Sequence, residues 1–130
     1  DTYLHLGAAG DALPIAGGVP FWTALMRGER SDPAIARVAS EPGYLIGGFR
    51  MTGDSTHWEI HPEGDEIIHL LSGAVNFVLE EPGGKRTIKL RDRGCCLVPR
   101  GVWHRVLVRR TSEIVFITFG RGTQHRPVDS

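Results

Sequence analysis

The sequence predicts an all-β fold, a barrel of many short antiparallel strands preceded by an arm and one short helix. Two observations lead to this prediction. The 17 Gly and eight Pro residues recur between short runs of Val, Ile, Leu and Phe, which is typical of antiparallel β folds and not of helical bundles. The length of 130 residues is about that of one domain, so we expect a single core.

Residues 1–34 are expected to precede the barrel. Residues 1–20 contain Gly-Ala-Ala-Gly and Gly-Gly and are expected to form an irregular arm that packs on the barrel or on a second subunit. After Pro20, residues 21–30 place apolar side chains at helical spacing, which predicts a short amphipathic helix. Trp22 in this helix is expected to be a lid or core residue.

The barrel itself is expected over residues 35–120. Strands are predicted at residues 35–40, 44–51, 57–61, 66–71, 74–80, 86–91, 95–98, 103–108 and 113–119. The runs Leu71-Ser72-Gly73 and Pro82-Gly83-Gly84 supply the positive-φ residues that tight hairpins need, so neighbouring strands should pair. Residues 121–130 follow as a tail, in which His125 is expected at the surface.

The charge balance argues for a small-molecule partner. Fifteen basic residues match fifteen acidic ones, so the chain has no net field to concentrate nucleic acid or to attract an anionic membrane. Its apolar runs are far shorter than the ~20 residues that span a bilayer. We therefore expect a soluble, cytoplasmic protein without a nucleic-acid or membrane partner.

The segment from residue 57 to residue 66 concentrates side chains that bind metals. Side chains two apart on a strand share a face, so Glu59 and His61 point the same way, as does His57 if the strand extends that far. After a turn at residues 62–65 the chain returns as an antiparallel strand, which can bring Glu66 beside His61. The strand geometry alone leaves open whether His57 or Glu59 contacts an ion.

The spacing of these residues resembles the two motifs of the cupin superfamily. Gly53 is followed by five residues, Glu59-Ile60-His61, four residues, Glu66, six residues and Gly73, which fits every spacing of the first motif. Glu59 stands where the family usually has His. The second motif is matched from Pro99-Arg100-Gly101 through His104, but Arg93 occupies the position of its opening glycine. The turn at that position is therefore expected to be shortened or shifted.

The resemblance implies a jelly-roll-like barrel, frequent homodimers and one divalent metal ion. Its ligands would be Glu59, His61, Glu66 and His104. Two carboxylates and two imidazoles make Mn²⁺ or Fe²⁺ at least as plausible as Zn²⁺, with Ni²⁺ also accepted. Apolar material in the arm and helix, Trp22 included, favours a homodimer as well.

The expected function is that of a metal-dependent enzyme acting on a small polar metabolite. Isomerase, hydrolase, lyase and oxygenase chemistry are not separated by these residues. A metal-bound hydroxide or His57 would act as the base, which makes His57 the candidate catalytic residue. A non-catalytic cupin that binds or senses a small ligand is the alternative, because the fold serves both roles. A barrel with a vestigial site is a third possibility.

Overall fold

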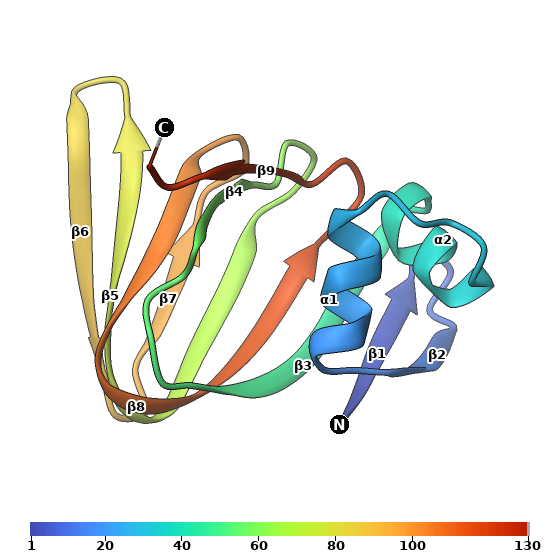
Figure 1. The fold of residues 1–130 in the computed structure, drawn as a ribbon, viewed down its shortest axis with the longest axis horizontal. Coiled ribbons are helices and arrows are strands. Elements are labelled where there is room, and N and C mark those ends of the chain that lie inside the picture. The colour runs from blue at the N-terminus through green and yellow to red at the C-terminus, as the bar shows by residue number, and fades with distance from the viewer. Residues whose placement is uncertain (130) are drawn as a thin grey trace.

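The computed structural model describes residues 1–129, which form a curled antiparallel sheet with two helices at one end (Figure 1). The elements are β1 (Thr2–Gly7), β2 (Ala12–Ala16), α1 (Val19–Met26), α2 (Pro33–Ser40), β3 (Gly43–Met51), β4 (His57–Ile60), β5 (Glu66–Glu81), β6 (Gly84–Arg91), β7 (Cys95–Val98), β8 (Trp103–Phe119) and β9 (Gln124–Pro127). The predicted all-β barrel is confirmed.

Two long strands organise the barrel. β8 pairs with β3, β4 and β5, and β5 pairs with β6, β7 and β8. The hairpin turn predicted at residues 71–73 is wrong, because β5 continues through it with shifted register. Gly73 has φ +103°, and a Cβ there would lie 2.3 Å from Ser112 Oγ, so this glycine makes a bulge where β5 crosses β8. The hairpin predicted at Pro82-Gly83-Gly84 is present, with Glu81 opposite Gly84.

The segment before the barrel differs most from the prediction. The strand predicted at residues 35–40 is wrong, because this segment belongs to α2. Asp32 caps the helix by accepting a hydrogen bond from the N–H of Ala34 at 2.9 Å, and Ile35 and Val38 turn one helical face into the core. The predicted irregular arm is wrong too, since β1 and β2 form a hairpin that extends the sheet beside β3.

The expected helix is present as α1, and its Trp22 packs inward. The indole Nε1 of Trp22 donates a hydrogen bond to Tyr3 Oη at 3.0 Å, and its ring meets Phe21 edge-on at 5.0 Å. Within the described part of the chain, no helix has the length and apolar character needed to cross a membrane. The cytoplasmic location stays a prediction.

Arg93 explains how the chain tolerates the missing motif glycine. Arg93 has φ 64°, a left-handed conformation that favours glycine. Its N–H donates to the Leu70 carbonyl at 2.7 Å, and the N–H of Gly94 donates to Arg91 at 2.8 Å. The turn therefore keeps a glycine-like backbone at residue 93 instead of moving to Gly94.

Candidate metal centre

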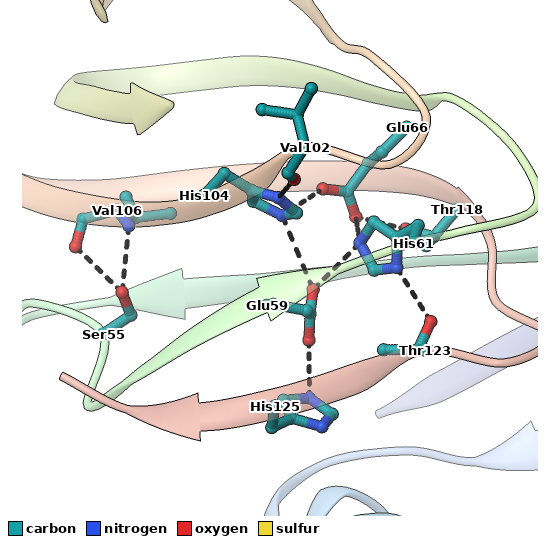
Figure 2. Close-up of polar contacts among 10 residues, drawn as sticks. All are labelled: Ser55, Glu59, His61, Glu66, Val102, His104, Val106, Thr118, Thr123 and His125. Atoms are coloured by element: carbon teal, nitrogen blue, oxygen red, sulfur yellow. Dashed lines mark hydrogen bonds and ion pairs between the residues drawn. The ribbon is translucent and has the colours of Figure 1, made fainter. Parts of the chain in front are cut away.

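Four polar side chains from neighbouring elements meet inside the barrel (Figure 2). Glu59 lies on β4, directly opposite His104 near the start of β8. His61 follows β4, and the turn after it returns the chain so that Glu66 begins β5. These are the residues the sequence predicted, and the structure brings all of them together.

The separations between the four side chains fit ligands around one ion. The Nε2 atom of His61 lies 3.0 Å from Glu59 Oε1 and 3.4 Å from Glu66 Oε2. The Nε2 atom of His104 lies 3.2 Å from Glu66 Oε1 and 3.7 Å from Glu59 Oε1. One ligand atom from each residue lies within 4.8 Å of all the others. Donors about 2 Å from a common metal have separations of this size.

The imidazoles present their Nε2 atoms to this centre. Nδ1 of His104 lies 3.1 Å from the Val102 carbonyl, so Nδ1–H donates and Nε2 is the nitrogen that faces the cluster. Nδ1 of His61 lies 2.8 Å from Thr123 Oγ1, and its Nε2 is buried without a hydrogen-bond partner among the described residues. Such an orphaned nitrogen, facing two carboxylates, fits a bound cation.

Burial leaves one approach to the centre. The side chains of His61, Glu66 and His104 are 3%, 7% and 4% exposed, whereas that of Glu59 is 28% exposed. Thr118 donates a hydrogen bond to Glu66 Oε2 and fixes the deepest carboxylate. Solvent therefore reaches the cluster from the side of Glu59.

The two carboxylates of the cluster favour the protonated, positively charged forms of His61 and His104. Burial lowers the pKa of each imidazole, but the carboxylates outweigh it and raise the pKa of His61 to about 10 and of His104 to about 9. Burial likewise opposes ionisation of Glu66, yet the two imidazoles lower its pKa to about 2. Three neighbouring imidazoles hold the pKa of Glu59 well below its usual range despite burial. In metal-free protein, two protons therefore supply the charge that a divalent ion would supply.

His57 lies outside the four-residue group. Its Nδ1 is 2.9 Å from Thr56 Oγ1, and its ring meets that of His125 edge-on with centroids 6.4 Å apart. His69 lies three residues after Glu66 on β5, so its side chain points to the opposite face, and it pairs with Cys95 of β7. The role of His57 stays a prediction.

The expectation of a surface position for His125 is wrong. Residues 124–127 form β9, which places His125 opposite Glu59, and its Nε2 lies 2.7 Å from Glu59 Oε2. Thr123, just before β9, contacts His61. The alternation of Thr123 and His125 is compatible with a strand, but no spacing within residues 120–127 fixes the direction of either side chain.

Comparisons with known proteins agree with this architecture. The family model described as "Cupin domain" matches residues 51–120, more than half of the chain. The chain belongs to the cupin family. The matched residues of this cupin include all four members of the cluster but neither Thr123 nor His125. A comparison with curated proteins gave no match.

Three solved structures show the same fold at low identity. A cupin-2 domain protein from Shewanella frigidimarina is 20% identical, with 57% of this chain and 68% of that one covered and a TM-score of 0.50. Hydroquinone 1,2-dioxygenase from a Sphingomonas species, solved with 4-hydroxybenzoate bound, is 18% identical, with 61% and 60% covered and a TM-score of 0.52. A cupin superfamily protein from Desulfitobacterium hafniense is 18% identical, with 58% and 66% covered and a TM-score of 0.50. The chain thus spans about two thirds or less of these relatives.

Proposed function

We propose that this cupin holds one divalent metal ion through Glu59, His61, Glu66 and His104 and acts as a metal-dependent enzyme on a small polar metabolite. The observation that carries the proposal is the buried, unpartnered Nε2 of His61 facing the carboxylates of two converging strands. A bound metal would give that nitrogen a partner, in place of the proton that pairs it with the carboxylates in metal-free protein.

The donor set favours Mn²⁺ or Fe²⁺, with Zn²⁺ next and Ni²⁺ accepted less readily. Two carboxylates neutralise the formal charge of a divalent ion, and hard oxygen donors suit manganese and iron better than a set of three imidazoles does. When bound, the ion would supply Lewis acidity to a substrate oxygen or to water. The four protein ligands leave positions for substrate if coordination is five or six.

The exposed edge of Glu59 is the proposed side for substrate approach. A hollow of about 300 Å³ lies between the helices and β9, and none of the four proposed ligands lines it. Its lining includes Thr123 and His125, which contact two of the four ligands, and it includes the cation Arg30. A small polar or anionic molecule suits such a lining. The 4-hydroxybenzoate bound by the dioxygenase with this fold is a molecule of that kind.

Protein purified without chelator is expected to contain about one divalent metal per chain, because four buried ligands converge on one point. The measurement is elemental analysis, followed by reconstitution with Mn²⁺ and Fe²⁺. Metal at a hundredfold its Kd should stabilise the fold by about 2.7 kcal/mol, which thermal unfolding would detect. Occupancy well below half after reconstitution would remove the proposal. Turnover of sugars, keto acids or phenols, with oxygen uptake monitored, separates an enzyme from a binding module.

The homodimer expected from the sequence is also proposed, but on a different surface. Trp22 packs inside, whereas an apolar row crosses five strands on the outer face of the sheet. Its members lie directly opposite one another in the order Leu4, Ile46, Ile117, Ile67 and Leu97. Leu4, Ile67 and Leu97 are 40%, 42% and 50% exposed. A second copy of the chain, packed face to face, would cover this row.

Leu97→Asp is expected to convert the dimer to a monomer, because it places a charge on the most exposed member of the apolar row. Light scattering at micromolar concentration measures the change. Val19→Asp is the matched control, since Val19 is 77% exposed on α1 and lies outside the row. A wild-type protein with the mass of one chain would contradict the proposal.

A further inference from the structure

The segment from Thr123 to Arg126, here called the strap, crosses the barrel beside β4 and lies outside the cupin match. Figure 1 shows β9 running along β4 on its way to the C-terminus. Glu59 is directly opposite His125, and Trp58 is directly opposite Arg126. Because side chains alternate along a strand, His125 shares the inner face with Glu59, and Arg126 shares the outer face with Trp58.

The inner face of the strap contacts two of the proposed ligands (Figure 2). His125 Nε2 lies 2.7 Å from Glu59 Oε2, which leaves Oε1 of the same carboxylate directed at the cluster. Thr123 Oγ1 lies 2.8 Å from His61 Nδ1, which leaves the unpartnered Nε2 directed at the same point. Thr123 and His125 thus each contact the ligand atom that the metal would not use. Each contact fixes the orientation of the atom that would bind the metal.

The outer face of the strap is fastened by Arg126. Its Nη2 pairs with Glu80 Oε2 at 2.6 Å, and its Cζ lies 4.6 Å from the Trp103 ring and 5.2 Å from the Trp58 ring. An ion pair combined with two indole contacts holds a guanidinium more firmly than a single surface pair does. These described contacts of Arg126 do not include any of the four proposed ligands, so it would affect them through the position of the strap.

We propose that the strap sets the metal affinity of this cupin: Thr123 and His125 are positioning residues for His61 and Glu59, and Arg126 keeps them in place. This inference rests on the proposed metal site. It assigns a role at that site to a segment outside the part of the chain that the family model recognises. In this arrangement metal binding and docking of the strap stabilise each other, because each requires the same orientation of Glu59 and His61.

The first test is Mn²⁺ titration of the wild type and of His125 variants by calorimetry. His125→Ala is expected to weaken binding by roughly 10–100-fold, the usual effect of losing a hydrogen-bond partner of a ligand. His125→Gln should recover much of the affinity, because its amide N–H can donate to Glu59. Gln124→Ala is the matched control, since Gln124 is the exposed neighbour of His125 on β9 and is not one of the four proposed ligands. X-ray absorption should count two imidazoles on the ion in the wild type and in His125→Gln.

The second test removes the Arg126 side chain, which holds the strap and whose described contacts do not include the proposed ligands. Arg126→Ala is expected to weaken Mn²⁺ binding several-fold, whereas Arg86→Ala, which breaks the nearby ion pair with Glu81, should leave it unchanged. Mn²⁺ should also slow amide hydrogen exchange over residues 124–126 in the wild type.

If His125→Ala and Arg126→Ala both bind Mn²⁺ with wild-type affinity, the proposed role of the strap is wrong, while the metal site itself is unaffected. A third imidazole on the ion, lost in His125→Gln, would make His125 a ligand and overturn its positioning role. Absence of Mn²⁺ and Fe²⁺ binding by the wild type would overturn the metal site itself, and the strap with it.

Discussion

Glu59→Ala is expected to weaken Mn²⁺ binding by at least about a hundredfold, or about 3 kcal/mol. The substitution removes one of two carboxylates that balance the charge of the ion, and it leaves His61 Nε2 without its neighbour at 3.0 Å. The measurement is calorimetric titration of metal-free protein. Glu59→His would restore the ligand type usual in the family and should shift preference from Mn²⁺ toward Zn²⁺ or Ni²⁺.

His57→Ala is the matched control for this prediction. Both residues lie on β4 two positions apart, yet only Glu59 belongs to the four-residue group. His57→Ala should therefore keep its metal and at most lower any turnover. Retained binding in Glu59→Ala together with lost binding in His57→Ala would instead select the other arrangement, with His57 and His61 as ligands and Glu59 as the base.

Metal binding near neutral pH is expected to release about two protons per ion. His61 and His104 have pKa values of about 10 and about 9, so both are protonated in metal-free protein at pH 7 and must become neutral to bind. The affinity should then rise by up to about a hundredfold for each pH unit between pH 7 and 9, and level off above the two pKa values. Unperturbed imidazoles would place this dependence near pH 6.5.

Calorimetry in buffers of different ionisation enthalpy counts the released protons. His104→Ala should release about one proton fewer than the wild type, because one raised pKa is removed. The same pKa values predict that ion pairs stabilise the metal-free fold fully between about pH 4.5 and pH 6.5. This contribution is lost as the pH rises through 9 to 10, and as it falls toward 2. An affinity that does not change between pH 7 and 9 would contradict the raised pKa values.

The four proposed ligands were predictable because their geometry is largely local. Alternation places Glu59 and His61 on one face, and a four-residue turn returns the chain at Glu66. The prediction of His104 as a ligand depended on the spacing of the second motif, because His104 lies far along the chain from the other three residues. By contrast, His125 reaches Glu59 across 66 residues, and no local pattern specifies such a pairing.

The errors in the predicted fold have physical reasons too. The run at residues 35–40 has apolar residues at spacings that fit a strand or a helix. The side chain of Asp32 caps α2 and so favours the helix. Gly73 was expected in a turn because positive φ is common there, but the same conformation serves a bulge inside a strand. A short apolar run and a lone glycine are each ambiguous until their tertiary partners are known.

The spacing of the ligands along the chain also bears on the order of folding. Glu59, His61 and Glu66 lie within eight consecutive residues where β4 connects to β5, whereas His104 on β8 and His125 on β9 come from distant segments. Closing a short loop is fast and has a small entropic cost, while long-range strand pairing is slow. A metal ion present during refolding would meet three ligands in this short segment before the remaining strands dock. Metal is therefore expected to accelerate folding as well as to stabilise its product.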